Sequence, residues 1–377
     1  MNLRLAALVG LGLAVSAVPA GAEPVFLARQ YARCTTCHFS PTGGGLLTPY
    51  GRSLTREELS TMGRGHSTAP ASGPDGEQAF LYGLLGSRLG NLSLGIDLRP
   101  GHLDVRFPGG QEKRDLLMNA EITAAYRAKG WTVYGELGRQ PLQAEGTRVD
   151  SFEHWVGYQS KKGFGFRAGR FLPAYGVHFS DHTAFNRRPL GLDTFDQVYG
   201  LELSHTTDRH LVQLTASPGR ADSIIDNDGT RGFVGAARVQ IDVSTRTVLV
   251  ASGLFHDKSD VNPRDGSAGL AFGFSPIRRL TIWTEGDAQW QQGLPGAPSY
   301  VLVNETGFEV YRGVWLKISP QLRTDFGDTS GGTIRWVFEL NLLPRTHWNV
   351  DLSHYRDKGR SNDIVTKTTL LQLHLYL

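Results

Sequence analysis

Apolar and polar residues alternate with a period of two through most of this chain, from about Phe80 to the C-terminus. In residues 91–99 one face is aliphatic and the other is small or charged; the aliphatic residues are Leu92, Leu94, Ile96 and Leu98. A turn signal, Pro100-Gly101, follows directly. Because successive side chains of a β-strand point to opposite faces, this pattern predicts a chain made mostly of half-buried strands.

Two kinds of protein have such strands: soluble sheets with one wet face, and closed membrane barrels. Many alternating runs reach about ten residues, the length that a tilted strand needs to cross a bilayer. Charged residues recur in mid-strand on the non-apolar face, where a water-filled lumen would accept them. Aromatic residues recur near strand ends, as interface girdles would: Trp131, Tyr134, Tyr199, Trp315, Trp348 and Tyr376. We therefore predict an all-β transmembrane antiparallel barrel, with a soluble β-sandwich or propeller as the alternative.

The number of strands follows from the length of the alternating region. At about 19 residues per strand and connection, the roughly 300 residues of 76–377 give about sixteen strands, an even number as in other bacterial barrels. One stretch, residues 171–197, breaks the alternation with prolines, glycines and clustered charge, and it contains His178 and His182. It predicts a long loop that is extracellular or folds inward.

The first 22 residues have the layout of a secretory signal peptide. Arg4 gives a short basic start, residues 5–18 are apolar, and Ala20-Gly21-Ala22 offers the small residues of a cleavage site. An uncleaved anchor is the alternative, but the apolar run is shorter than the roughly 20 residues of a spanning helix. After cleavage 38 basic residues face 36 acidic ones, so the charge gives no reason to expect nucleic acid as a partner.

Both cysteines of the chain lie in one motif, Cys34-Thr35-Thr36-Cys37-His38. C-x-x-C-H is the attachment signature of c-type haem, in which two thiols add across the haem vinyl groups and the histidine ligates the iron. Export fits this interpretation, and no further cysteines exist for a four-cysteine or three-cysteine zinc site. A disulfide or a redox pair is the alternative. We predict one covalent haem c, bound by Cys34, Cys37 and His38.

The sequence leaves the sixth ligand of the iron open. The candidates are Met62, His66 and a barrel histidine that faces the lumen, such as His102 or His178. Met62 follows a short helix expected at residues 55–61. For Met62 and His66 an ordinary packing or linker role is the alternative, and a site with no sixth protein ligand is a further one.

Residues 23–75 form a distinct segment that ends in a small, polar stretch typical of a linker. A segment of 53 residues buries too little surface to enclose a haem alone. We therefore expect it to fold inside or against the barrel lumen as a plug. Arg29, Arg33 and Arg52 are then expected to pair with the haem propionates, with solvated surface charges as the alternative.

Three stretches near the motif resemble the fused cytochrome–porins of the outer membrane: residues 26–30 (FLARQ), 34–38 (CTTCH) and 47–52 (LTPYGR). The best-known members are iron-oxidising outer-membrane cytochromes. The resemblance implies a monohaem plug in a barrel of about sixteen strands, and electron transfer from extracellular Fe(II) to a periplasmic carrier. It covers only residues 26–52. Two features depart from it: the Pro41-Thr42-Gly43-Gly44-Gly45 insertion, and a final Leu377 where such barrels usually end in an aromatic residue.

These observations predict an outer-membrane cytochrome–porin that transfers electrons across the membrane. Its expected partners are outer-membrane lipid, a periplasmic electron carrier and extracellular Fe(II) as a donor. The alternative is an outer-membrane solute channel with a structural or gating N-terminal plug, and a sensor with a five-coordinate haem is a third hypothesis. No nucleophile and base stand in a pattern that predicts catalysis. Whether the chain is an enzyme stays open, with Fe(II) oxidation as the candidate reaction.

Overall fold

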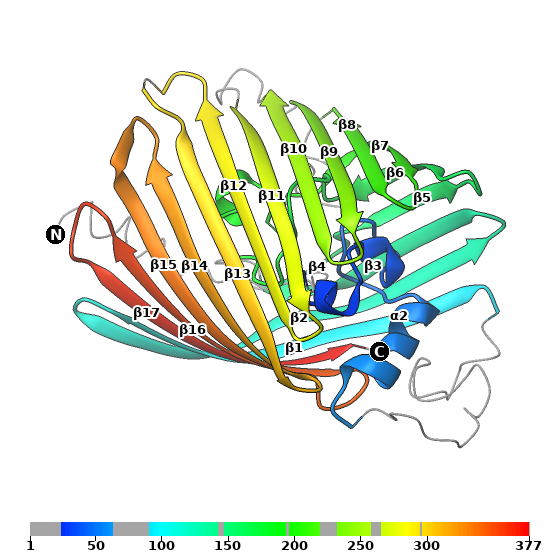
Figure 1. Cartoon of the computed structure of the whole chain (residues 1–377), viewed down its shortest axis with the longest axis horizontal. Helices are drawn as coiled ribbons and strands as arrows, with labels where there is room; N and C mark the ends of the chain where they lie inside the picture. Colours follow the sequence, from blue (N-terminus) through cyan, green and yellow to red (C-terminus); the bar gives the residue numbers. More distant parts are fainter. Residues whose placement is uncertain are drawn as a thin grey trace.

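The computed structural model describes residues 24–62, 90–141, 147–193, 196–218, 232–257, 265–294 and 296–376. The predictions for residues 1–22, His66, the linker and Leu377 lie outside these ranges. Seventeen strands form one antiparallel sheet (Figure 1). They are β1 (Leu92–Phe107), β2 (Gly110–Ala128), β3 (Trp131–Pro141), β4 (Thr147–Asp150), β5 (His154–Gln159), β6 (Phe164–Phe171), β7 (Val198–Thr206), β8 (His210–Ser217), β9 (Phe233–Ser244), β10 (Thr247–Asp257), β11 (Asp265–Ile277), β12 (Leu280–Gln291), β13 (Ser299–Tyr311), β14 (Val314–Asp325), β15 (Asp328–Leu342), β16 (Trp348–Gly359) and β17 (Val365–Tyr376).

The sheet closes on itself. β1 pairs with β2 along one edge and with β17 along the other, so neither terminal strand has an unpaired edge. β4 and β5 pair with opposite ends of β3. They therefore occupy a single strand position in the barrel wall, one after the other. The described strands thus form a closed antiparallel barrel of sixteen positions, which confirms the predicted fold and strand number.

The two faces of the wall differ as the alternation predicts. On β7, Leu201 and Leu203 are 45% and 52% exposed, whereas Glu202 between them is 2% exposed. Large apolar residues are exposed around the whole barrel, for example Ile122, Val156, Leu214, Leu249, Leu270, Leu302 and Phe338. An apolar outer face on a closed sheet is what a bilayer requires, because no backbone polar group is left unpaired in lipid. The polar residues of the alternating pattern face the lumen.

Two aromatic residues predicted for the interface girdles face the lumen instead. Tyr134 is 2% exposed and Trp315 is 1% exposed. Tyr134 packs in a cluster with Phe39 and Leu46, and Trp315 packs with Val25 and Ala28. Their partners belong to the N-terminal segment, which covers these inward positions, so the girdle assignment was wrong for both.

The long loop predicted at residues 171–197 folds inward. It follows β6, contains the short helix η6 (Arg188–Leu190) and is called the inner loop here, residues 172–197. Its backbone N–H groups bond to side chains across the lumen: Gly176 to Ser252 (2.8 Å), Val177 to Glu285 (2.8 Å) and Phe185 to Gln321 (3.0 Å). These acceptors lie on β10, β12 and β14, so the inner loop crosses the lumen rather than leaving the barrel (Figure 1).

The N-terminal segment, residues 24–62, lies in the lumen at the end where the strands are joined by short turns (Figure 1). We call this end the turn end and the opposite one the loop end. At the turn end, the N–H groups of Thr61 and Met62 donate to the carbonyls of Leu343 (2.8 Å) and Pro344 (2.9 Å). Arg33 donates to the carbonyl of Thr207 at 2.6 Å. The segment is therefore attached to the barrel at several separate turns.

Four short helices make up the N-terminal segment: η1 (Pro24–Arg29), η2 (Cys34–Thr36), α2 (Pro49–Leu54) and η3 (Thr55–Leu59). The helix expected at residues 55–61 begins earlier, at Pro49, because Thr48 caps it by accepting the Gly51 N–H at 3.1 Å. Its last turn, η3, is a π-helix. Among the described residues, no helix is long and apolar enough to cross a membrane.

Apolar residues of η1 pack into the lumen. Leu27 is fully buried in a cluster with Tyr175 and Val177 of the inner loop and Trp283 of β12. Trp283 donates its indole N–H to the carbonyl of Pro24 at 3.0 Å. Burial of a leucine side chain stabilises by about 1.5–3 kcal/mol, so η1 joins the inner loop and the wall into one packed core.

Candidate functional site

The C-x-x-C-H motif forms a single helical turn. The N–H groups of Cys37 and His38 both donate to the carbonyl of Cys34, at 3.1 and 2.9 Å. Residues at positions i, i+3 and i+4 of a helical turn lie on one face, which brings Cys34, Cys37 and His38 together. Both cysteines are free thiols, and burial raises the pKa of Cys37 to about 11. The structure thus places the three predicted residues on one side of one turn.

His38 is fixed as a neutral ring. Its Nδ1 donates a hydrogen bond to the carbonyl of Gly44 at 2.8 Å, since a carbonyl can only accept. Burial lowers the pKa of His38 to about 4, although the bond to Gly44 opposes this. A neutral imidazole that donates from Nδ1 carries its lone pair on Nε2. This arrangement is the one in which proteins orient a histidine that ligates a metal ion.

The glycine run that departs from the cytochrome–porin resemblance supplies this contact. Gly43, Gly44 and Gly45 all have positive φ angles, of 85°, 78° and 56°, a conformation that residues with a Cβ rarely adopt. The resulting turn directs the Gly44 carbonyl back to His38. At Gly45 a Cβ would overlap the Tyr134 hydroxyl. The run was visible in the sequence, but only the structure shows that it orients His38.

The LTPYGR stretch supports the motif from the other side. The N–H of Thr48 donates to the carbonyl of Cys37 at 2.8 Å, and the N–H of Phe39 donates to the carbonyl of Leu46 at 3.0 Å. At Gly51 a Cβ would overlap the backbone of Cys37, so glycine lets α2 approach the motif closely. Two of the three stretches that carry the resemblance, residues 34–38 and 47–52, therefore form one local unit.

The three arginines expected at the haem propionates bind the barrel. Arg29 forms an ion pair with Glu309 of β13, and Arg33 forms one with Asp242 of β9 at 2.6 Å. Arg52 is 6% exposed and donates to the carbonyl of Leu94 on β1. All three thus connect the N-terminal segment to the wall, a role that neither the propionate prediction nor the surface-charge alternative anticipated.

The candidates for a sixth ligand occupy different places. Met62 is 74% exposed at the turn end. His102 lies on the outer face of β1 and pairs with Asp115, its side chain 51% exposed, so the prediction that it faces the lumen was wrong. His178 lies on the inner loop inside the barrel. His182, also on this loop, bonds through Nδ1 to Asp193 at 2.9 Å.

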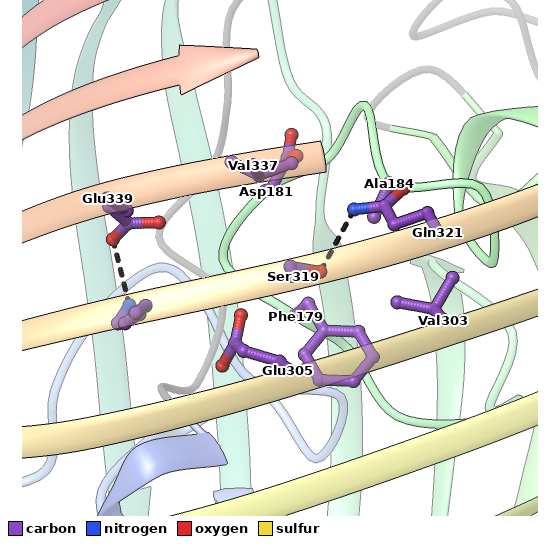
Figure 2. A pocket seen from close by; sticks show the side chains of 10 residues that line it. Phe179, Asp181, Ala184, Val303, Glu305, Ser319, Gln321, Val337 and Glu339 are labelled. Atoms are coloured by element: carbon purple, nitrogen blue, oxygen red, sulfur yellow. Dashed lines mark hydrogen bonds and ion pairs between the residues drawn. The ribbon is translucent and has the colours of Figure 1, made fainter. Parts of the chain in front are cut away.

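The inner loop packs tightly against the wall on the side of β13 to β15. Figure 2 shows Phe179, Asp181 and Ala184 of the loop facing Glu305, Ser319 and Glu339 of these strands. The space that remains between them has a volume of only about 10 Å³, which is room for about one water molecule. The lumen is therefore filled on this side.

A wider hollow opens towards the loop end. It has a volume of about 410 Å³ and lies between η6 and the ends of β12 and β14 that are at the loop end of the barrel. Its lining is largely polar and includes Arg188, Asp193, Asp196, Gln289 and Arg323. We call this hollow the vestibule. The inner loop supplies part of its lining.

No group of three or more histidine, cysteine, aspartate or glutamate side chains is arranged to hold a metal ion in the described ranges. A c-type haem needs fewer protein groups, because the porphyrin supplies four of the iron ligands. Two thiols and one neutral histidine on a single face fit that group. The residues present are therefore compatible with a covalent haem, and its presence stays a prediction.

Comparisons with known proteins identify relatives by fold alone. No family model matches the sequence, and no curated protein sequence matches it. OmpT of Vibrio cholerae is similar in structure, with a TM-score of 0.58 at 11% identity over 76% of this chain and 97% of that one. OprB of Pseudomonas putida has a TM-score of 0.59 at 8% identity over 76% and 94%. The outer membrane channel DcaP of Acinetobacter baumannii has one of 0.54 at 9% identity over 76% and 97%.

At these identities the similarity is one of fold. This chain has the closed sixteen-position β-barrel fold of outer-membrane porins. OmpT is described as expressed in the outer membrane, and DcaP is described as an outer membrane channel.

Proposed function

We propose that this chain is an outer-membrane barrel that carries one covalent haem c on its N-terminal segment and transfers electrons across the membrane. The proposed donor is an extracellular reductant such as Fe(II), and the acceptor is a periplasmic carrier. The observation that carries the proposal is the turn of residues 34–38, in which two free thiols share a face with a neutral, oriented histidine. The comparisons support the barrel part of this proposal only.

Cys34 and Cys37 would bind the haem through thioether bonds. Each sulfur bonds to one vinyl carbon and the thiol hydrogen goes to the other, so the addition needs no oxidant. His38 would ligate the iron through Nε2, with Gly44 fixing the ring. When bound, a c-type haem supplies reversible one-electron oxidation and reduction.

The surrounding packing supports this role. Phe39 and Leu46 lie in a buried cluster with Trp155 and Phe171, which keeps water away from one side of the motif. Exclusion of solvent and hydrogen bonds to the axial histidine are the means by which proteins tune a haem potential. In bacterial barrels short turns are periplasmic, and the position of the N-terminal segment at the turn end supports a periplasmic carrier as the acceptor.

A denaturing gel tests the proposal. The full-length protein is produced with a cytochrome c maturation system, denatured, separated and stained for haem peroxidase activity, beside a Cys34→Ala/Cys37→Ala variant. We expect a stained band for the natural sequence that is absent from the variant. An unstained natural protein that still migrates as a folded barrel before heating would rule the proposal out.

The second candidate function is a solute channel gated by the N-terminal segment. The similarity to outer-membrane porins and to a named channel favours it, as does the polar vestibule of about 410 Å³. In this function the segment would have to leave the lumen. Against it stand the buried contacts of Leu27 and the ion pairs of Arg29 and Arg33, which keep the segment in place.

Ion conductance separates the two functions. Purified protein in planar bilayers is compared with a variant that lacks residues 24–62 but keeps the export signal. Electron transfer through a filled lumen predicts little conductance for the full chain and a rise for the variant. Large, steady conductance of the full chain would favour the channel.

A further inference from the structure

Both histidines of the inner loop, His178 and His182, have a buried ring nitrogen without a hydrogen-bond partner among the described residues. Nε2 of His178 is enclosed by protein and has no hydrogen-bond partner among the described residues. The ring also bonds to the backbone of Tyr175, and by elimination this bond uses Nδ1. Burial, with the charges of Arg187, Arg238 and Arg167, keeps the pKa of His178 well below its ordinary value. The ring is therefore neutral, with its lone pair on Nε2.

A short chain of hydrogen bonds connects this part of the inner loop to the cysteine motif. Arg238 of β9 donates through Nε to the carbonyl of Gly176 at 2.8 Å and through Nη2 to Gln240 at 2.8 Å. Gln240 in turn donates to the carbonyl of Ala32 at 3.1 Å. Gly176 is two residues from His178, and Ala32 is two residues from Cys34. The two segments thus meet at Arg238, whose charge also lowers the pKa of Cys34 against the larger effect of burial.

A second set of contacts leads from His178 to the other end of the motif. Arg167 of β6, whose charge acts on His178, lies 4.1 Å from the ring centre of Phe171. Phe171 shares a buried cluster with Phe39, the residue that follows His38. Two nitrogens of Arg167, Nε and Nη1, are buried without hydrogen-bond partners. Unpaired donors of this kind favour an anionic group nearby, as a haem propionate would be.

We propose that His178 is the second axial ligand of the haem iron, opposite His38, so that the haem lies between the N-terminal segment and the inner loop. This inference rests on the proposed covalent haem. Coordination uses the lone pair of a neutral ring, so no proton or electron is transferred when the bond forms. Because Nε2 is enclosed, the side chains around it must move apart to admit the iron.

The other candidates fit this role less well. Met62 is mostly exposed at the turn end, and His102 is ion-paired outside the barrel. His182 belongs to the opposite part of the inner loop, where the neighbouring Thr183 accepts a hydrogen bond from Arg335 of β15 at 2.8 Å. Nε2 of His182 is likewise buried without a hydrogen-bond partner among the described residues, but its Nδ1 bonds to Asp193 of the same loop at 2.9 Å. His182 is therefore a suitable control.

The test measures the spin state of the haem iron in the full-length, matured protein. Optical and electron paramagnetic resonance spectra of the natural sequence are compared with those of His178→Ala and His182→Ala. We expect a low-spin, six-coordinate haem that excludes carbon monoxide in the natural protein and in His182→Ala. In His178→Ala we expect conversion to high spin and rapid carbon monoxide binding, with the low-spin spectrum restored by added imidazole.

A second variant, His178→Met, controls for misfolding of His178→Ala. His178→Met keeps a side chain that can ligate iron, and it should give a sulfur-to-iron charge-transfer band and a raised reduction potential. A natural protein with a high-spin, carbon monoxide-binding haem would overturn the inference, as would unchanged low-spin spectra in both His178 variants. If the denatured natural protein lacks a haem-stained band, the proposed function itself fails, which is a distinct result.

Discussion

At the scale of single residues, the turn that holds Cys34, Cys37 and His38 depends on local geometry, but the contacts that support it do not. The three side chains share a face because they lie three and four positions apart in one helical turn. The bond from His38 to Gly44 could not be predicted, since it depends on how three consecutive glycines turn. The partners of Arg29 and Arg33 were likewise out of reach, because ion pairs between residues 209 or more positions apart leave no local pattern. The same holds for the bond from Arg52 to the Leu94 carbonyl, which spans 42 positions.

A single methyl group at Gly45 should loosen the N-terminal segment. Gly45→Ala places a Cβ on a residue with a φ of 56° and against the Tyr134 hydroxyl. We expect a cost of about 1–3 kcal/mol, which corresponds to roughly five- to hundredfold faster opening of the segment. Trypsin cleavage within residues 24–62 measures this opening. Gly135→Ala, with an ordinary φ and nothing near its Cβ, should cleave at the natural rate; equal rates for both variants would refute the account.

At the scale of elements, the described part of the molecule consists of the barrel wall and two segments inside it, the N-terminal segment and the inner loop. The wall was predictable because its strands repeat the two-residue alternation of apolar and polar side chains. The positions of the N-terminal segment and the inner loop became clear only from the structure. Tyr134 and Trp315 show why: alternation assigns each to a strand but cannot say that the N-terminal segment covers its inner face. The inner loop was recognised by its broken pattern, but its bonds to Ser252 and Glu285 arise only once the barrel closes.

The ion pair between Arg29 and Glu309 should anchor η1 to β13. Their side chains are 17% and 2% exposed. Breaking a buried pair costs about 3–5 kcal/mol, and because Arg29 is partly exposed we expect about 2–3 kcal/mol for Arg29→Gln. Hydrogen exchange of the backbone amides in residues 24–33 should accelerate accordingly.

The matched control for Arg29→Gln is Arg106→Gln. Arg106 pairs with Asp104 on β1, but its side chain is 66% exposed, and exposed pairs contribute about 0–1 kcal/mol. Exchange in residues 24–33 should therefore stay unchanged in Arg106→Gln. Equal protection of these amides in the Arg29→Gln variant and the natural protein would show that the pair does not anchor η1.

At the scale of the whole molecule, a porin-like barrel is combined with two segments of its own chain that pack inside the lumen. The N-terminal segment lies at the turn end and the inner loop crosses the lumen (Figure 1), and the vestibule lies between η6 and the loop ends of β12 and β14. An ordinary diffusion channel needs a continuous water path, and on the side of β13 to β15 the packing leaves room for about one water molecule. A carrier of electrons needs only that its redox group be close to a partner on each side.

The most direct test of electron transfer uses sealed vesicles. Matured full-length protein is reconstituted into liposomes that contain an oxidised soluble cytochrome c, and a membrane-impermeant reductant is added outside. We predict reduction of the enclosed cytochrome c at a rate that rises with the amount of protein and falls to the protein-free rate in Cys34→Ala/Cys37→Ala. Equal rates for the natural protein and this variant would contradict the account.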